Sequence, residues 1–177
     1  MVHYAAPVGS YAFLFHDVFG VERLTALPGA TDFTRETTEA VLGEAAKLAV
    51  DHFLPLNSTG DREGCRKANG GVVTPGGFKQ AYDAFAGGGW VGLAADPAYG
   101  GQGLPYALGN AVNEMVTATN MALAMVPGLT MGAIAAINAN GSEAQKQFYL
   151  PNMLSGRWTG TMNLTEPQCG TDLGLIR

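Results

Sequence analysis

The chain has 177 residues, of which 47% are hydrophobic, and it carries a formal net charge of −5 with a pI near 5.0. This length and apolar content are enough for one globular domain with a substantial core. The acidic balance excludes an extended basic footprint, so we expect neither nucleic acid nor an anionic membrane as a partner.

The surface is expected to be poor in charge, because only 14% of the residues are charged and 25 are glycine. Part of such a surface is expected to pack against another body, such as a second copy in a homo-oligomer.

The cysteines and histidines predict no metal site. Cys65 and Cys169 are far apart in the sequence and fit neither a disulfide framework nor a Cys-x-x-Cys site. Three histidines, His3, His16 and His52, lack partners at metal-ligand spacing. The sequence shows no targeting signal and no stretch approaching eighteen consecutive apolar residues, so we predict a cytoplasmic protein that does not span a membrane.

The first third of the chain predicts two helical segments. Tyr11–Phe19 is short and apolar, with Ser10 as a possible N-cap and Gly20 as its end. Asp32 or Thr34 can start a longer amphipathic helix. Its apolar stripe repeats at three- and four-residue spacing: Val41, Leu42, Ala45, Leu48, Ala49 and Phe53.

A long loop is predicted over Pro55–Gly77, where polar residues and glycines replace the periodic pattern. Five charged residues there could contact a ligand, although a solvated surface is the favoured interpretation: Asp61, Arg62, Glu63, Arg66 and Lys67.

Further helices are predicted in the second half. Thr74-Pro75 provides a cap and a first-turn proline for a helix that buries Phe78, Ala81, Tyr82 and Phe85 and ends at Gly87–Gly89. Trp90–Ala95 can be a buried strand or a helical turn. The Gly100–Gly103 tract lacks the strand and helix that a dinucleotide-binding loop requires.

Two apolar helices are then expected. Pro105 opens the first, and the second runs from about Leu129 to Asn140. The small residues of the second, Gly128, Gly132, Ala133 and Ala136, leave room for close helix packing or for a pocket wall, and packing is favoured from the residues alone. Ser142–Gln145 forms a capping box, and Gly156 closes the helical region.

The end of the chain carries the chemistry. Thr159–Leu164 can form an extended strand, and Glu166-Pro167 turns the backbone sharply. Gly170 then lets the main chain approach a ligand, and Thr171 adds a hydroxyl near exposed N–H groups, a combination suited to a phosphate. By composition alone, such a strand and turn are more often structural.

Three blocks stand in one order along the chain. The first is G-W-V-G-L (89–93) with Y-G-G-Q-G-L (99–104), and the second is G-S-E-A-Q-K-Q-F-Y-L-P (141–151) with S-G-R-W (155–158). The third is M-N-L-T-E-P-Q-C-G-T-D (162–172). Together they closely resemble the signature of the acyl-CoA dehydrogenase family, and the opening of the chain resembles long members that act on unusual acyl-CoAs.

The resemblance implies a mainly α fold: an N-terminal helical-bundle domain over residues 1–157, with an extension over 1–31. Residues 158–177 would hold the first strand of a truncated middle β domain. It implies flavin contacts by the Met162 and Leu164 backbone and the Thr165 hydroxyl, and pyrophosphate contacts by Gly170 and Thr171. Met162 and Thr171 depart from the commoner aromatic and serine.

The resemblance also implies an acyl-chain wall at Met125, Gly128 and Gly132. The catalytic base is expected beyond Arg177, because Glu166 suits turn geometry better than proton abstraction.

The implied partners are acyl-CoA and electron-transfer flavoprotein, in a homo-oligomer with FAD. The residues present offer too little surface to retain FAD by themselves, so we expect this segment to be inactive and free of cofactor. The alternative is a non-catalytic helical interaction or oligomerisation module of the same ancestry.

Overall fold

The computed structural model describes residues 3–26, 33–68 and 70–177. The described α-helices and strands are α1 (Val8–Ala12), α2 (Arg35–Leu48), α3 (Leu54–Glu63), β1 (Arg66–Ala68), β2 (Gly71–Val73), α4 (Phe78–Gly87), α5 (Tyr106–Thr119), α6 (Met121–Asn140) and α7 (Glu143–Leu154). Wider π-helical turns, Phe13–Val18 and Ala49–Phe53, follow α1 and α2. The mainly α prediction is confirmed.

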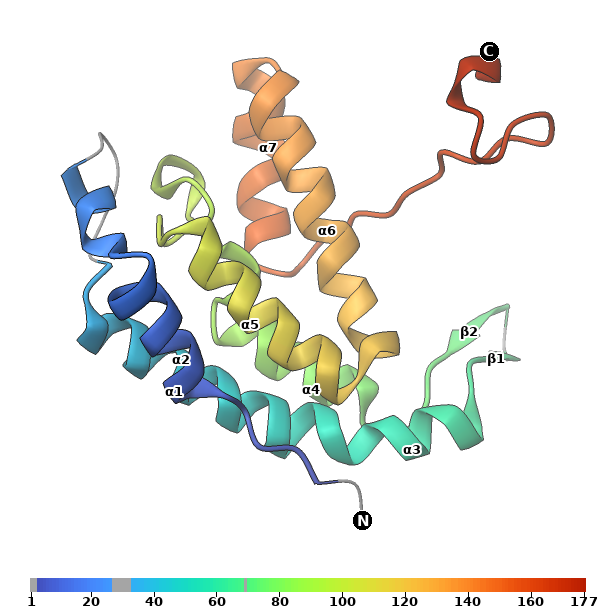
Figure 1. The fold of residues 1–177 in the computed structure, drawn as a ribbon. Helices are drawn as coiled ribbons and strands as arrows, with labels where there is room; N and C mark the ends of the chain where they lie inside the picture. Colours follow the sequence, from blue (N-terminus) through green and yellow to red (C-terminus); the bar gives the residue numbers. More distant parts are fainter. Residues whose placement is uncertain (1–2, 27–32, 69) are drawn as a thin grey trace.

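The helices pack around one core. Helix α5 lies against α2 and α6, and α6 runs beside α7 (Figure 1). Side chains from three helices and one π-helical turn are fully buried in this core: Leu42, Phe53, Leu108, Met115, Val116 and Leu150. The predicted stripe of α2 thus faces the core, as amphipathic periodicity requires.

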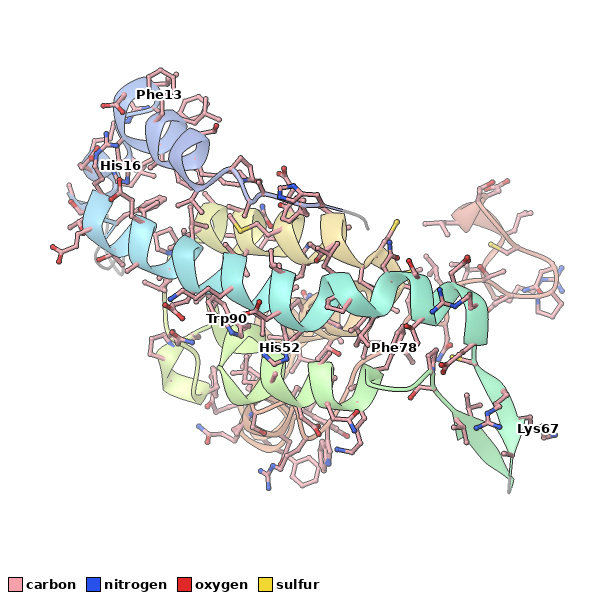
Figure 2. The ribbon with its side chains drawn as sticks, turned by 90° about the horizontal axis from the view of Figure 1, so that it is seen from below. Phe13, His16, His52, Lys67, Phe78 and Trp90 are labelled. Atoms are coloured by element: carbon pink, nitrogen blue, oxygen red, sulfur yellow. The ribbon has the colours of Figure 1, made fainter. Side chains whose placement is uncertain are left out.

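The N-terminal segment is tied to α2 by a buried histidine. His16 Nε2 lies 3.0 Å from Thr38 Oγ1, and His16 Nδ1 contacts the Glu22 carboxylate (Figure 2). Helix α1 begins at Val8 with Pro7 before it, so Ser10 lies inside the helix and is not its cap. Gly20 ends the segment with a positive φ, as expected.

Thr34 is the N-cap of α2. Its Oγ1 accepts a hydrogen bond from the Thr37 N–H at 3.1 Å, and the alternative start, Asp32, lies outside the described residues.

The predicted loop over Pro55–Gly77 is wrong, because this stretch contains α3 and a β-hairpin. Pro55 stands in the first turn of α3, which continues directly from the π-helical turn Ala49–Phe53. The hairpin pairs Arg66 with Val73 and projects from the helices, with Lys67 near its tip (Figure 2). Its base is held by the Gly76 N–H, which donates to Glu63 Oε2 at 2.9 Å. The solvent-facing residues of α3 have the polar composition of a loop, and the strands of the hairpin are only three residues long.

The start of α4 also differs from the prediction. The helix begins at Phe78, and Gly77 precedes it with a φ of 85°, so Thr74 is not its cap. Of the two alternatives for Trp90–Ala95, the structure shows a 3-10 turn at Trp90–Gly92.

Helix α6 begins at Met121, eight residues before the predicted start. Asn120, which is 1% exposed, caps it by accepting from the Leu123 N–H at 3.1 Å. The Asn120 amide also donates to the Phe53 carbonyl at 3.3 Å and so joins α6 to the turn after α2. Pro127 lies inside the helix.

Among the described residues, α6 is the one helix long and apolar enough to cross a membrane by length and composition alone, a test that a core helix of a soluble protein also passes.

The predicted strand over 158–164 is not formed. Residues 159–165 leave the helical body as an extended trace without a ladder partner (Figure 1). A strand needs a neighbour to satisfy its backbone groups, and the described chain supplies none at this position. The domain boundary at residue 157 stays a prediction.

Candidate functional site

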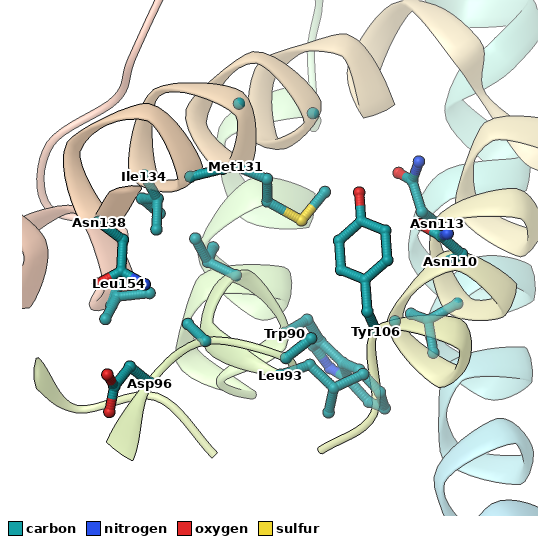
Figure 3. A pocket seen from close by; sticks show the side chains of 18 of the residues that line it. Trp90, Leu93, Asp96, Tyr106, Asn110, Asn113, Met131, Ile134, Asn138 and Leu154 are labelled. Carbon is teal, nitrogen blue, oxygen red and sulfur yellow. The ribbon is translucent and has the colours of Figure 1, made fainter. Parts of the chain in front are cut away.

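A cavity of about 370 Å³ lies between α5, α6, the end of α7 and the loop that follows α4 (Figure 3). Apolar side chains form most of its wall, including Leu93, Val112, Met131, Ile134 and Leu154. A concave, mostly apolar site of this size is typical of a small-molecule pocket.

The first sequence block builds the loop side of the cavity by folding back on itself. The Gln102 N–H donates to the Gly92 carbonyl at 2.9 Å, and the Leu104 N–H donates to the Leu93 carbonyl at 3.0 Å. A Cβ at Gly101 would lie 2.1 Å from the Ala95 carbonyl oxygen, so only glycine fits there. The two halves of the block are therefore one structural unit.

The second block attaches α7 to this loop. The capping box is confirmed: Ser142 accepts from the Gln145 N–H at 3.3 Å, and the Gln145 side chain accepts from the Ser142 N–H at 2.8 Å. The Tyr99 hydroxyl donates to the Glu143 carboxylate at 3.1 Å. Hydrogen bonds from Gln147 and Tyr99 lower the pKa of Glu143, whereas desolvation and the Glu143 carboxylate raise the pKa of Tyr99.

Gly156 explains the conformation after α7. Its φ is 74°, its carbonyl accepts from the Tyr82 hydroxyl at 3.0 Å, and an added Cβ would lie 2.4 Å from the Ala86 Cβ. Glycine alone satisfies both the positive φ and the close approach to α4. The chain therefore leaves α7 in one fixed direction.

The predicted acyl-chain wall lies on one face of α6. Met121, Met125, Gly128 and Gly132 recur at spacings of four, three and four residues, which places them on one side of the helix. Gly128 and Gly132 line the cavity, and no atom lies within 4 Å of a Cβ added at either. Met125 is 55% exposed and is not among the residues that line the cavity.

The predicted flavin-contacting residues lie apart from the cavity wall, on the terminal segment (Figure 1). Met162 is 66% exposed, Leu164 is 44% exposed, and Thr165, Gly170 and Thr171 are exposed as well. An exposed hydroxyl and open space at the Gly170 Cβ position fit a backbone surface that can approach a flat ring and its phosphates.

The predicted turn forms at Glu166–Cys169, where each residue's N–H donates to the other's carbonyl, at 2.9 and 3.0 Å. Its compactness comes partly from the Cys169 thiol, which is buried and lies 2.7 Å from the Asp172 carbonyl. Glu166 is therefore a turn residue.

Sequence reasoning missed the residue that anchors this segment. Thr130 is fully buried in α6, accepts a hydrogen bond from the Gly160 N–H at 3.1 Å and donates to the Val126 carbonyl at 3.0 Å. A Cβ at Gly160 would lie 2.5 Å from the Ala133 Cβ. A lone hydroxyl in a run of apolar residues was the available signal.

Residues 35–157 match the acyl-CoA dehydrogenase N-terminal domain. The chain is 41% identical over 174 residues to 3-methylmercaptopropionyl-CoA dehydrogenase of Ruegeria pomeroyi, covering 98% of this chain and 30% of that protein. It is 34% identical over 141 residues to a butyryl-CoA dehydrogenase of Syntrophomonas wolfei, covering 78% of this chain and 23% of that protein.

An acyl-CoA dehydrogenase from Bacillus anthracis, solved in complex with FAD, has the same fold over 80% of this chain and 22% of its own, with a TM-score of 0.64 and 23% identity. The chain thus spans less than a third of the length of these relatives. Because the domain match covers α2 to α7, the chain belongs to the acyl-CoA dehydrogenase family.

Proposed function

We propose that this chain is the N-terminal part of a FAD-dependent acyl-CoA dehydrogenase and that its cavity receives the acyl chain of the substrate. One observation carries the proposal: Gly128 and Gly132, on the helix that the family resemblance assigns to the acyl wall, line an apolar cavity of about 370 Å³. At roughly 30 Å³ for a water-sized group, this volume suits about a dozen heavy atoms, and hence a short acyl chain.

The reaction breaks the C–H bonds at the α and β carbons of the thioester and forms a C=C bond between them. FAD, when bound, supplies the acceptor for the β hydrogen, which leaves as hydride, and the α proton goes to a base. That base is expected beyond Arg177. The residues of this chain bind and orient: the cavity excludes water around the acyl chain, and the terminal segment offers Thr165 and its neighbours to the flavin ring.

The wider assignments are part of the same proposal. Electron-transfer flavoprotein would reoxidise the enzyme, which would be a cytoplasmic homo-oligomer. The exposure of α6 supports the presence of further protein packed against it, because only 28% of its most apolar 18-residue window is buried. The wall that contacts the acyl chain would then be formed by α6 and that layer together.

The experiment uses the complete enzyme, meaning the longer chain of which we propose this segment to be the N-terminal part. Gly132→Leu fills the cavity wall and should lower kcat/KM for hexanoyl-CoA relative to butyryl-CoA about tenfold or more, the usual cost of rejecting a methylene group. Gly43→Leu is the matched control, because Gly43 also stands in a helix with open space at its Cβ position but lies outside the cavity. An unchanged chain-length profile in Gly132→Leu would reject the assigned wall.

The flavin contact has its own test in the complete enzyme. Thr165→Val removes one hydroxyl and should weaken flavin binding by about 1–3 kcal/mol if the hydroxyl's partner stays buried and unpaired. Flavin occupancy and turnover equal to those of the unmodified enzyme would remove Thr165 from the site.

The alternative function is a helical interaction module without redox chemistry. Flavin absorbance, measured on both the isolated 177-residue chain and the complete enzyme, distinguishes the two functions. We expect the isolated chain to be colourless after gel filtration and the complete enzyme to be yellow. A complete chain without flavin absorbance would favour the module.

A further inference from the structure

The cavity has a polar stripe on the side opposite its glycine wall. Tyr106, Asn110 and Asn113 follow one another on α5 at spacings of four and three residues, so they share one face of that helix, and all three line the cavity. Asn138 adds a third amide from α6. Figure 3 shows the Tyr106 ring extending toward Met131, with Asn113 beside it.

These polar groups have no protein partner within the described ranges 3–26, 33–68 and 70–177. Other asparagines close to these helices use their amides: Asn120 caps α6, Asn140 donates to the Ala136 carbonyl at 3.2 Å, and Asn152 donates to the Phe148 carbonyl at 2.8 Å. Two further polar groups of the cavity wall are paired: Asp96 accepts from the Ala98 N–H, and Tyr99 donates to Glu143. The cavity amides, the Tyr106 hydroxyl and the Trp90 indole N–H are thus the polar groups of the wall that have no protein partner among the described residues.

An alkyl chain filling this cavity would displace water from the half-buried amides of Asn113 and Asn138 and return no hydrogen bond, which is costly for polar groups. An oxygen atom on the acyl chain would replace that water. Each asparagine amide presents both donors and an acceptor, so it can bind either a carbonyl or a hydroxyl group.

We propose that the acyl group taken by this cavity carries a carbonyl or hydroxyl oxygen, and that Asn110 and Asn113 select for it. The inference rests on the proposed function and adds the class of substrate. Both asparagines line the cavity, and of the two Asn110 is exposed and Asn113 is half-buried. Because the two amides lie about one helical turn apart, they offer hydrogen bonds at two positions along the acyl chain.

The test compares two thioesters of equal size in the complete enzyme, 5-oxohexanoyl-CoA and 5-methylhexanoyl-CoA, which differ by a carbonyl oxygen in place of a methyl group. We expect kcat/KM to favour the oxo compound about tenfold, the ratio that roughly one net hydrogen bond produces. The double variant with Asn110→Leu and Asn113→Leu keeps side-chain size and should bring the ratio to unity or reverse it. Asn57→Leu, on the exposed face of α3 outside the cavity, should leave the ratio unchanged.

A preference for the methyl compound in the unmodified enzyme would overturn the substrate class while leaving the dehydrogenase assignment standing. An oxo preference that survives the double variant would overturn the role of the two asparagines. If no thioester reduces the flavin of the complete enzyme, the proposed function and this inference fail together. Tyr106→Phe, which removes only the hydroxyl, is expected to lower the oxo preference by a smaller factor than the double variant.

Discussion

Helices α2 and α6 show two different relations between a helix and its protein. Helix α2 buries one stripe, with Leu42 and Ala45 fully covered, and turns charged residues to solvent. Helix α6 has no charged residue, yet only 28% of its most apolar window is buried. The packing of α2 is completed by this chain, whereas α6 presents an apolar face that the described residues leave largely uncovered.

The largest expected effect is a difference in the free energy of unfolding between substitutions in α2, whose apolar stripe is buried, and in α6, whose apolar face is largely exposed. Leu42→Ala should destabilise the chain by about 2–5 kcal/mol, because it removes fully buried methyl groups and leaves a cavity. Met125→Ala on α6 should change the free energy of unfolding by less than about 0.5 kcal/mol, because that side chain is 55% exposed. Urea unfolding of the isolated chain measures both, and equal losses would contradict the comparison.

A second prediction concerns the attachment of the terminal segment to α6. Gly160→Ala places a Cβ 2.5 Å from the Ala133 Cβ and should cost about 1–3 kcal/mol of that attachment. Limited proteolysis should then remove residues 161–177 sooner than in the unmodified chain. Gly170→Ala, with open space around the new methyl group, is the control, and equal cleavage rates in both variants would show that Gly160 does not anchor the segment.

Replacing a helical glycine by alanine should have the same effect on stability in α2 and α6, but only the replacement in α6 should change acyl-chain preference. Gly132→Ala and Gly43→Ala each add a methyl group in open space inside a helix and should stabilise the chain by up to about 1 kcal/mol. In the complete enzyme only Gly132→Ala should alter acyl-chain preference. Thermal unfolding measures the stability of both variants, and a chain-length profile measures their acyl-chain preference. A changed acyl-chain preference in Gly43→Ala would contradict the prediction.

The smallest expected effect depends on pH. The pKa of Glu143 is lowered from its ordinary value of 4.5 by hydrogen bonds from Gln147 and Tyr99. A lowered carboxyl pKa stabilises the fold above pH 4.5, and the stabilisation disappears as the pH falls through the folded-state value. Tyr99→Phe should therefore be less stable than the unmodified chain at pH 7, with the gap closing below pH 4.5. Tyr106→Phe should show no such gap, and a gap independent of pH would remove Glu143 from the explanation.

The sequence predicted those elements whose signals are local. The stripe of α2, the capping box at Ser142 and the turn at Pro167 each depend on residues within one or two turns of chain. The hairpin after α3 was missed, because its two strands are only three residues long and mostly exposed, and because its base is held by Glu63 reaching Gly76. Tertiary contacts of this kind leave no periodic pattern.

The candidate site was predicted in part for the same reason. Gly128 and Gly132 were identified through resemblance, and the structure adds the opposite wall of the cavity, which comes from α5 and from the loop after α4. The sequence could not predict that the side-chain amides of Asn110 and Asn113 have no hydrogen-bond partner in the described chain, because this depends on the positions of all neighbouring residues. Thr130 could be noticed as a hydroxyl among apolar residues, but its bond to Gly160 joins positions thirty residues apart.

The hydrogen bond between Thr130 and Gly160 connects the terminal segment to α6, the helix that also forms one wall of the cavity. Gly128 and Gly132 face the cavity on one side of the helix, and Thr130 and Ala133 meet Gly160 on the other. A displacement of α6 by a bulkier acyl chain therefore moves the attachment point of the terminal segment in the same direction. In the complete enzyme, the fit of the substrate's tail would thus set the position of the surface proposed to meet the flavin, and chain length would affect the rate of hydride transfer as well as affinity.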